Sequence, residues 1–385
     1  MRIAIFTDSF WPQINGVTTA IWNYCVPLAD EGHEFIIFAP KPAGSVAEAP
    51  AHKNIQTIWL PSFPLPSYKD YLVAYHLPSA AKKKLNEFAP EIVHVHTPFF
   101  VAKQGLDYAK KHHLPSVGTF HTLLTEFLEY LPLPVKELKR SPIMEKLTWK
   151  YMQHFYSKCK VLTTPSTANA HELQQHGFKH VQVLTNGIDY TLFAKTKPKK
   201  STKKETKLLY YGRISFEKRI DIVVDAFARV HEQFPHTTLT IIGSGPAENA
   251  LKAQTHALGI ASAVHFPGAF RGKELAERVQ QHDIMVTASP METQGLTVLE
   301  AMAAGLAVVG ADARAIPLAI GNNERGLLFK EGDAIDCATQ LEKLLYHPAL
   351  RKKLIAAGKK FSKHYDKKTV AKQLLKLYHS SLHHA

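Results

Sequence analysis

The chain has 385 residues, a length that suggests two or three domains. Hydrophobic residues make up 45% and charged residues 21% of the sequence, which is average globular usage and excludes a disordered chain. The formal net charge of +14 favours an anionic partner (nucleic acid, an acidic lipid surface or a phosphorylated substrate), although Lys-rich solvated helix faces would give the same excess. No clean run of ~20 apolar residues exists, so we expect no transmembrane span. Three scattered cysteines fit a reducing cytosol.

The first half of the chain alternates strand-like and helical segments. Apolar runs predict strands at residues 2–7, 35–39, 55–60, 92–96, 116–120, 161–165 and 181–184. Helical patterns lie between them, for example at residues 80–88 and 100–112. This alternation favours a parallel sheet that helices cover on both faces.

A second alternating region follows the stretch KTKPKKSTKKETK, which has no apolar face and is typical of a solvated linker. Strands are predicted at residues 208–211, 238–242, 264–266, 284–288 and 307–310, with helices between them. We therefore expect an α/β fold of two Rossmann-like domains facing each other across a cleft. The predicted division is an N-terminal domain over 1–194, a linker over 195–207, a C-terminal domain over 208–364, and a helix over 365–385 that packs back on the N-terminal domain.

Ligands of open α/β sheets bind beyond the carboxyl ends of the strands, so the loops there are informative. After the first strand, Gly16 stands just before a helix expected from Thr18, where a bare backbone can approach a ligand at the positive helix end. The loop is not GxGxxG, so the usual dinucleotide fingerprint is absent. An ordinary Gly in a βα loop is the simpler interpretation of this position alone.

The loop YGRISFEKR follows the first strand of the second domain. Arg213 and Lys218 flank its path into a helix, and two cations at such a position suit a diphosphate. The alternative is a pair of surface salt bridges to Glu217 and Asp221. The later sequence IIGSGP indicates only a Gly-rich turn after a strand.

The stretch SPMETQGLTVLEAMAAG is the most specific. Glu292 lies in a loop after a strand, and Glu300 lies eight residues on, inside a helix expected to start near Leu296. Such a helix would direct its free N–H groups, from residues 294 to 297, at an anion. Glu300 could accept hydrogen bonds from a diol such as a ribose. Two unrelated glutamates are the alternative.

A strand with the sequence SVGTF ends at His121, which would face the mouth of the cleft. An imidazole there could donate to a sugar hydroxyl. The chain has 22 histidines, so a structural role is an open alternative.

Taken together, these motifs resemble the retaining glycosyltransferases of family 4, which have the two-domain GT-B fold. The resemblance is carried, in the family's order, by PQINGV, TFHT, NGID, YGRISFEK, IIGSGP and the stretch from Glu292 to Glu300, and it covers nearly the whole chain. The segments TDSFWPQINGV and SFPLPSYKDYLVAYHLP are also similar to the subgroup that glucosylates lipids such as diacylglycerol. Asn15 stands where the family often has a second Gly.

The resemblance implies a donor site in which Gly16 contacts the diphosphate of a nucleotide-sugar through its backbone. Arg213 and Lys218 would neutralise that diphosphate, and Glu300 would bind the ribose. The resemblance also implies retention of configuration without a metal, a cofactor or a firmly identified nucleophile, which fits the absence of a DxD pair in a cleft loop. Preorganised charges would then stabilise the leaving group. A UDP-sugar is the expected co-substrate.

The resemblance places two residues next to the chemistry. Glu292 would bind hydroxyls of the transferred sugar, helped by the backbone N–H groups of Gln294, Gly295 and Leu296. His121 would contact the same sugar near the reaction centre.

Three hypotheses about the partner of this protein compete. The first is a hexosyltransferase, most simply of glucose, that acts on a lipid and binds an anionic membrane as a peripheral protein at the inner face of the cell membrane. The second is an enzyme with the same donor chemistry that acts on a soluble sugar or a polysaccharide. A basic nucleic-acid-binding protein is disfavoured because no RNP pattern, helix-turn-helix or zinc finger occurs. Aromatic and basic residues interleave over residues 131–160, as in an interfacial segment, although an aromatic core face opposite a solvated Lys face is the alternative. The aromatic residues that we singled out in the N-terminal domain, six of which precede this segment, are Trp59, Phe63, Tyr68, Tyr71, Phe127, Tyr130, Trp149, Tyr151 and Phe155. The basic residues that accompany them are Lys136, Lys139, Arg140, Lys146, Lys150, Lys158 and Lys160.

Overall fold

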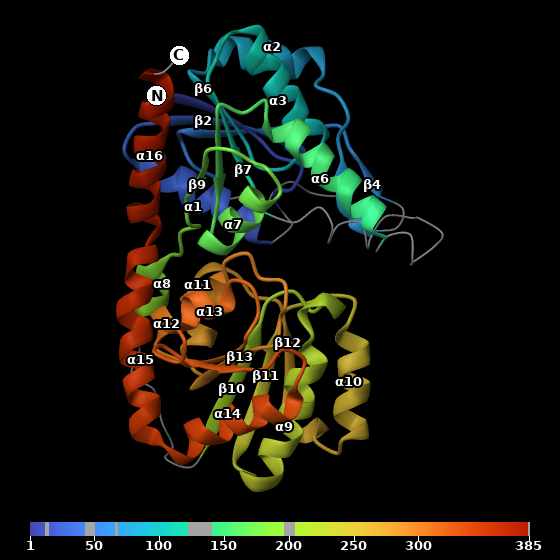
Figure 1. Cartoon of the computed structure of the whole chain (residues 1–385), viewed down its shortest axis with the longest axis vertical. Helices are drawn as coiled ribbons and strands as arrows, with labels where there is room; N and C mark the ends of the chain where they lie inside the picture. The colour runs from blue at the N-terminus through green and yellow to red at the C-terminus, as the bar shows by residue number, and fades with distance from the viewer. Residues whose placement is uncertain (12–14, 43–50, 66–67, 122–140, 196–204, 384–385) are drawn as a thin grey trace. The chain divides into compact units, whose positions relative to one another are not determined.

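A computed structural model describes residues 1–11, 15–42, 51–65, 68–121, 141–195 and 205–383. The chain divides into two units (Figure 1): unit 1 comprises Met1–Gly187 and Lys367–Ala385, and unit 2 comprises Ile188–Asp366. Short helix α8 (Tyr190–Ala194), which the sequence-based division assigned to the N-terminal domain, packs against α11 (Gly272–Val279) and α12 (Leu296–Ala304) of unit 2. Most of the predicted linker lies outside the described residues.

Unit 1 is built on a seven-stranded parallel sheet of order β3-β2-β1-β6-β7-β8-β9. The strands are β1 (Arg2–Phe6), β2 (Glu34–Pro40), β3 (Ile55–Leu60), β6 (Ile92–Val95), β7 (Ser116–Thr119), β8 (Val161–Thr164) and β9 (Val181–Val183). The strands β4 (Phe63–Leu65) and β5 (Tyr68–Val73) form a separate antiparallel pair. Strands β1, β2 and β6 are apolar almost throughout because both sheet faces are buried.

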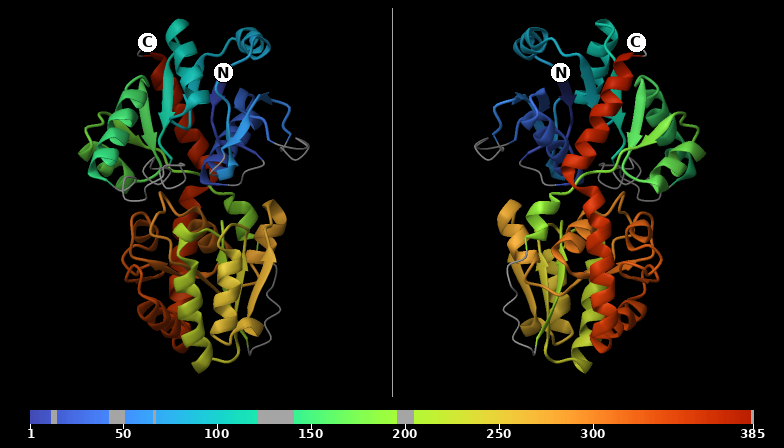
Figure 2. Two further views of the ribbon diagram at one scale, coloured as in Figure 1. Left: turned by 90° about the vertical axis from the view of Figure 1, so that its right-hand side faces the viewer. Right: turned by 90° about the vertical axis from the view of Figure 1, so that its left-hand side faces the viewer.

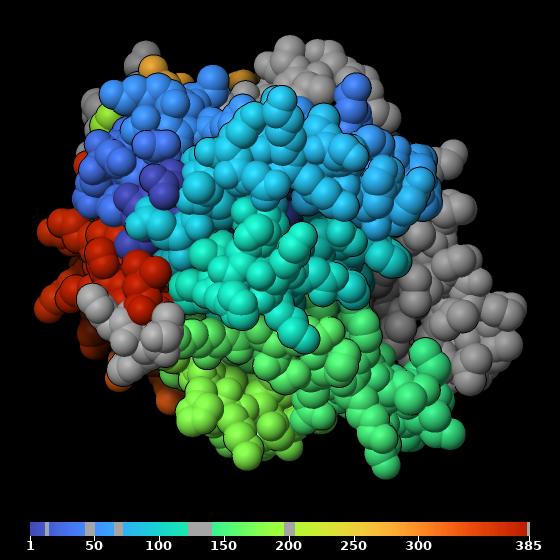
Figure 3. Space-filling model, turned by 90° about the horizontal axis from the view of Figure 1, so that it is seen from above, coloured from blue at the N-terminus to red at the C-terminus, as the bar shows by residue number. Residues whose placement is uncertain are grey.

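The helices of unit 1 form two apolar cores, one on each face of the sheet. On one face lie α2 (Ser79–Phe88), α3 (Phe100–Lys111) and α6 (Pro142–Tyr156), and Figure 3 shows cyan to teal residues, the range of α2 and α3, over the middle of the view from above. On the other face, α16 (Lys367–His383) packs along α1 (Gly16–Asp30). In both side views α16 (red) lies between the blue and the green elements of unit 1 (Figure 2). Unit 1 also contains α7 (Thr167–Gln175).

Unit 2 has a six-stranded parallel sheet of order β12-β11-β10-β13-β14-β15. Its strands are β10 (Thr206–Tyr211), β11 (Thr237–Ile242), β12 (Val264–Gly268), β13 (Ile284–Thr287), β14 (Ala307–Ala311) and β15 (Leu327–Phe329). Its other helices are α9 (Ile220–Gln233), α10 (Glu248–Ala257), α13 (Ile316–Ile320), α14 (Ala334–Tyr346) and α15 (Pro348–Ser362). Cores again fill both faces of the sheet. The prediction of two α/β units with parallel sheets is confirmed.

The NGID motif ends unit 1 and opens unit 2. Asn23 Nδ2 of α1 donates to Gly187 O at 2.6 Å, and Tyr24 OH donates to Asn186 Oδ1 at 2.8 Å. Asp189 caps α8 by accepting from Leu192 N at 3.0 Å. The motif therefore has a structural role at the point where the chain leaves the sheet of unit 1.

Over the described residues, no helix has the length and apolar character needed to cross a bilayer.

A buried carboxylate organises the carboxyl edge of the unit 1 sheet. Helix α3 begins after Phe99, whose side chain has no oxygen to cap it. Asp8, which follows β1, supplies the acceptor instead: its carboxylate accepts from Val101 N at 2.9 Å and from Thr97 Oγ1 at 2.8 Å. Burial raises the pKa of Asp8 to about 6, although these hydrogen bonds favour the carboxylate. One side chain thus ties β1 to the helix that follows β6.

We expect Asp8→Ala to lower the free energy of unfolding of unit 1 by roughly 2–3 kcal/mol, because it removes a cap and leaves buried donors without acceptors. Asp107→Ala is the matched control, since Asp107 lies on the same helix, half-exposed in an i,i+4 pair with Lys103. Its loss should cost no more than about 0.5 kcal/mol. Urea unfolding, with hydrogen exchange of the α3 amides, measures both changes. Equal losses in the two variants would show that Asp8 does not cap α3.

Candidate active site

The candidate donor residues of unit 2 gather where the strand order reverses. Strand β10 lies between β11 and β13, so the connections after β10 and β13 leave in opposite directions. Such a switch point creates a crevice at the carboxyl edge of an open α/β sheet. Arg213 and Lys218 follow β10, while Glu292 follows β13. The topology therefore brings these three predicted residues to one edge.

The Gly-rich turn IIGSGP supports the loop that carries the two cations. Gly243 has φ +147°, and a Cβ there would lie only 1.9 Å from Gly212 O, so no other residue fits. Ile214 N donates to Ser244 O at 3.0 Å, and Ala247 N donates to Ile214 O at 3.1 Å. The turn after β11 thus fixes the backbone from which Arg213 and Lys218 project.

Lys218 and Glu292 form an ion pair across the switch point. Lys218 Nζ lies 2.6 Å from Glu292 Oε1, and the two side chains are only 23% and 21% exposed. Burial alone would raise the pKa of Glu292, but the charge and the hydrogen bond of Lys218 outweigh it and hold that pKa below its usual value. Sequence reasoning gave the two residues separate ligands, a diphosphate and a sugar. In the free protein each is instead the other's partner.

Of the two alternative acidic partners in this loop, Glu217 lies close enough to Arg213 to act on its charge, whereas Asp221 is engaged by another arginine. Asp221 pairs with Arg219, whose Nη2 lies 3.1 Å from Asp221 Oδ2. Glu217 accepts a hydrogen bond from Ser215 Oγ at 2.7 Å. Arg213 is half-buried, and this burial lowers the pKa of its guanidinium, which nonetheless stays charged at neutral pH. A half-buried arginine at a switch point suits an anionic ligand.

Helix α12 begins where the sequence predicted, at Leu296. Gly295 is its N-cap with φ +76°, and no side chain of a described residue caps the helix. The backbone N–H groups in the first turn of α12 therefore have no side-chain cap, and the turn that precedes them contains buried Gln294. These groups and the helix dipole favour an anion.

Glu300 is partly buried, in the second turn of α12. Burial raises its pKa to about 8, so the free protein holds it mostly protonated at neutral pH. Glu300 Oε2 lies 3.3 Å from the hydroxyl of Tyr211, and that hydroxyl donates to Thr297 O at 2.6 Å.

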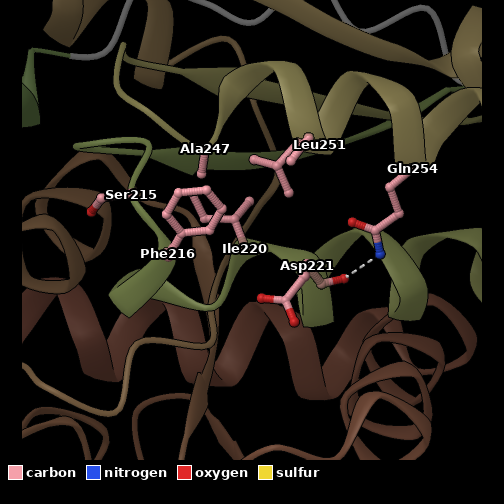
Figure 4. A pocket seen from close by; sticks show the side chains of 8 residues that line it. Ser215, Phe216, Ile220, Asp221, Ala247, Leu251 and Gln254 are labelled. Atoms are coloured by element: carbon pink, nitrogen blue, oxygen red, sulfur yellow. Dashed lines mark hydrogen bonds between the residues drawn. The ribbon is translucent and has the colours of Figure 1, made fainter. Parts of the chain in front are cut away.

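A small pocket of about 90 Å³ adjoins the same loop (Figure 4). Phe216, Ile220, Ala247 and Leu251 give it apolar walls, and Gln254 Nε2 donates to Asp221 O at 3.0 Å at one end. Among the described residues, no cation lines this pocket. Lys218 of the same loop pairs with Glu292 instead. The pocket therefore lacks the chemistry of a phosphate site.

The two residues of unit 1 that we predicted to contact a ligand, Gly16 and His121, lie in different surroundings. Asn15 caps α1 by accepting from Val17 N and Thr18 N, so the helix begins at Gly16, two residues before the expected start. No described atom lies within 4 Å of where a Cβ on Gly16 would be, so packing does not require a glycine there. His121 is 5% exposed, and its Nε2 lies 2.9 Å from Nδ1 of His96.

His96 and Asp8 were not singled out by sequence reasoning. The available signal for His96 was the alternation in His94-Val-His96, which places two imidazoles on one face of a strand end. The cap formed by Asp8 had no local signal, because its partners lie about ninety residues away in the sequence, at Thr97 and Val101.

Comparisons with known proteins agree with this geometry. The family profile described as "Glycosyltransferase Family 4" matches residues 14–192, and the one described as "Glycosyl transferases group 1" matches residues 193–361. The chain is 30% identical to the "Alpha-monoglucosyldiacylglycerol synthase" of Streptococcus pneumoniae, over 80% of this chain and 70% of that protein. It is 27% identical to a "GDP-mannose-dependent alpha-mannosyltransferase" of Mycolicibacterium smegmatis, over 88% of this chain and 86% of that protein.

A solved structure of Anabaena Alr3699/HepE in complex with UDP superposes with a TM-score of 0.76, at 16% identity, over 99% of this chain and all of that one. This likeness shows the two-domain GT-B fold. The relatives differ in donor and in acceptor, so neither is fixed by family membership. The two profiles together with a relative at 30% identity show that the chain belongs to glycosyltransferase family 4 and is a GT-B glycosyltransferase.

Proposed function

We propose that this glycosyltransferase moves a hexose, most simply glucose, from a UDP-sugar to a lipid acceptor such as diacylglycerol, with retention of configuration and without a metal ion. The observation that carries the donor half is the cluster at the unit 2 switch point: Arg213, the ion pair of Lys218 with Glu292, and the uncapped start of α12. Two cations and a helix N-terminus complement a diphosphate. The partly buried carboxyl group of Glu300 complements a ribose diol.

The mechanism that follows is electrostatic. As the bond between the sugar and the diphosphate breaks, negative charge grows on the leaving group, and Arg213, Lys218 and the α12 N–H groups stabilise it. Donor binding would draw Lys218 from Glu292 toward the phosphates. The freed carboxylate of Glu292 can then accept from hydroxyls of the transferred sugar. No carboxylate of this cluster is assigned as a nucleophile.

The lipid acceptor is supported by α6 of unit 1. Ile143, Leu147 and Tyr151 repeat at i, i+4 and i+8, and they are 72%, 53% and 44% exposed. Exposed Lys146 and Lys150 accompany this stripe, which we call the α6 stripe. Apolar side chains flanked by lysines suit an anionic lipid surface.

Part of the predicted interfacial segment does not contribute. Trp149 and Phe155 are buried in the core of unit 1, so the alternative of an aromatic core face is the correct one for these two residues. Lys136, Lys139 and Arg140 lie outside the described residues. A soluble sugar or polysaccharide acceptor is the second candidate, favoured by the variety of the relatives.

The substitutions Arg213→Ala and Glu292→Gln should affect UDP affinity differently. Loss of Arg213 removes a charge-assisted hydrogen bond worth about 1.5–3 kcal/mol, so UDP affinity should fall about 10- to 150-fold. Glu292→Gln should leave UDP affinity unchanged or tighter, because Lys218 is released, while transfer falls severely. Calorimetric titration with UDP and transfer assays with and without EDTA measure these effects.

Arg219→Ala is the matched control for Arg213, since Arg219 is an exposed arginine of the same loop that pairs with Asp221. Its UDP affinity should stay close to that of the unchanged protein. Equal affinity losses in both arginine variants, or inhibition of transfer by EDTA, would contradict the proposed donor site.

Binding of a UDP-sugar should depend on the protonation of Glu300. The pKa of Glu300 is raised to about 8 in the free protein, and the ribose requires the carboxylate, so binding must release a proton below that pH. Affinity should therefore rise as pH increases from 6 to 8, by up to about tenfold per unit, and level off above 8. Glu300→Gln should remove this dependence. Calorimetry in two buffers of different ionisation enthalpy measures the released proton, and a pH-independent affinity in the unchanged protein would refute the assignment.

The α6 stripe should bind the protein to anionic vesicles at low salt. Charge reversal of Lys146 and Lys150 should weaken sedimentation with phosphatidylglycerol vesicles, because each lysine contributes about 1 kcal/mol near such a surface. Ile143→Ser with Leu147→Ser should weaken it through lost apolar insertion. High salt should release the protein. UDP affinity should not change in either variant.

Two control variants distinguish the effect of the α6 stripe from the general effect of changing positive charge or apolar surface elsewhere on the protein. Lys82→Glu with Lys84→Glu reverses two exposed lysines of α2, and Ile335→Ser with Leu258→Ser removes two exposed aliphatic side chains of unit 2. Both should sediment like the unchanged protein. If the α6 variants behave no differently from these controls, the soluble acceptor becomes the better assignment.

A further inference from the structure

Tyr211, the last residue of β10, places its hydroxyl group between two oxygen atoms of α12. Its side chain is 3% exposed and packs in the same core cluster as α12. Its backbone lies opposite Ile242 in the parallel pairing of β10 with β11, so the sheet fixes the point at which the ring enters the core. The hydroxyl oxygen lies 2.6 Å from Thr297 O and 3.3 Å from Glu300 Oε2.

The single proton of this hydroxyl group cannot serve both oxygens equally. Burial raises the pKa of Tyr211 well above its usual value, so the phenol stays protonated at physiological pH. Thr297 O is a carbonyl oxygen that can only accept, and its contact is the shorter one, so the Tyr211 proton lies on that bond. A lone pair of the hydroxyl oxygen then faces Glu300 Oε2. This contact is favourable when Oε2 carries a proton and donates it.

The two carboxyl oxygens of Glu300 therefore have different surroundings. Oε2 lies against Tyr211. Oε1 accepts from no described residue, and it is not one of the described polar atoms that are buried without a partner, so solvent reaches it. The side chain as a whole is partly buried. A ligand can thus contact Oε1, whereas Oε2 is held by the protein.

When Glu300 loses its proton, the hydrogen bond with Tyr211 has to reverse. A carboxylate can only accept, so the hydroxyl group must turn its proton from Thr297 O to Oε2. Thr297 O keeps a partner in that state, because helix geometry places the N–H of Ala301 four residues on. The reversal leaves no buried acceptor without a donor, and Oε2 is held in both protonation states.

One charged side chain acts on Glu300 in the sense opposite to Tyr211. Burial raises the pKa of Glu300 to about 8, the hydrogen bond of Tyr211 lowers it, and the negative charge of Asp189 raises it. Asp189 belongs to the NGID motif and caps α8, which packs against α12. The motif thus has an electrostatic effect in unit 2 besides its structural role.

The other elements that pack against α12 do not add to this balance. Strand β14 and helix α13 have no ionisable side chain. Helix α15 approaches at Gly358, which lies against Met302. The four charged residues of α11 form two i,i+4 ion pairs among themselves. Among the described residues, Tyr211 and Asp189 are the side chains that shift the proton equilibrium of Glu300.

We propose that Tyr211 is a positioning residue for Glu300: its hydroxyl group follows the proton of that carboxyl group and holds Oε2, which leaves Oε1 as the oxygen that contacts a ligand diol. Asp189 acts in the opposite sense, because its negative charge favours the neutral carboxyl group. On binding at neutral pH, the proton leaves Glu300 for solvent and the Tyr211 O–H turns toward Oε2. The proposal rests on the proposed function only for the ligand, which is the ribose of a UDP-sugar.

The proton equilibrium can be measured in the free protein, without a ligand. In protein labelled with 13C at the glutamate carboxyl groups, the signal that is absent from Glu300→Gln reports the titration of Glu300. Tyr211→Phe should raise the pKa of Glu300, since the ionised form loses a donor, and Asp189→Asn should lower it, since a negative charge is removed. The asparagine still caps α8. Changes in the same direction in both variants, or none in Tyr211→Phe, would overturn the proposal.

Two matched controls make the same chemical changes elsewhere in unit 2. Tyr210→Phe removes a hydroxyl group from a buried tyrosine of the same strand, which donates to Arg213 O at 3.0 Å. Asp333→Asn makes the acid-to-amide change at the cap of α14. Neither control should move the titration of Glu300. A change in Tyr210→Phe as large as that in Tyr211→Phe would contradict the assignment to the Tyr211 hydroxyl group.

Calorimetric titration with UDP-glucose between pH 6 and 9 tests the positioning role. Tyr211→Phe should bind about 3- to 10-fold more weakly near pH 7, as expected for one lost hydrogen bond, and its affinity should level off at a higher pH. In Asp189→Asn the affinity should level off at a lower pH. A merely structural role of Tyr211 predicts the same loss of affinity at every pH, and that result would refute positioning.

Failure of the proposed function is distinguishable from failure of this inference. If UDP-glucose does not bind to the unchanged protein, the proposed donor is wrong. The titration of Glu300 in the free protein and in its Tyr211→Phe variant still decides whether Tyr211 holds that carboxyl group.

Discussion

Both sheets of this protein are covered by helices on both faces, and that burial governs where chemistry can occur. Strands buried on two sides leave room for polar side chains almost only at their ends. In unit 2 these ends carry Arg213, Lys218 and Glu292. In unit 1 they carry Asp8, His96 and His121. The candidate residues are therefore gathered by topology, since parallel strands bring their carboxyl ends to one edge.

The ion pair of Lys218 with Glu292 shows how unit 2 can keep charged groups ready in the absence of a ligand. A partly buried ammonium or carboxylate alone would pay a large desolvation penalty. Together, at 2.6 Å, each satisfies the other, and the pKa of Glu292 stays low. Under the proposed function, a diphosphate would offer Lys218 a stronger partner than one carboxylate, so that donor binding would exchange one ion pair for another. Glu300 is in the opposite situation, because burial raises its pKa to about 8 and favours the neutral carboxyl group.

The sequence was sufficient for the architecture because apolar strands and amphipathic helices are local patterns. It predicted the start of α12 at Leu296, but it placed the start of α1 at Thr18 because the cap formed by Asn15 was not recognised. The candidate residues of the YGRISFEK and E-x7-E motifs were found from their positions after predicted strands, and the family resemblance then assigned a ligand to each. Their pairing could not be predicted, because the contact of Lys218 with Glu292 joins positions seventy-four residues apart. The link of Tyr378 to His94 spans 284 positions and has no local signal at all.

The two units differ in the kind of ligand that their polar groups suit. The edge of the unit 2 sheet presents formal charges and a helix N-terminus, which stabilise an anion. The edge of the unit 1 sheet presents imidazoles that are held neutral by burial, and Thr119 and Tyr378 fix the orientation of His94 through hydrogen bonds to its two ring nitrogens. Because burial keeps these rings uncharged, each of them offers at most one donor and one acceptor nitrogen, whereas the charged groups of unit 2 can compensate an anion directly.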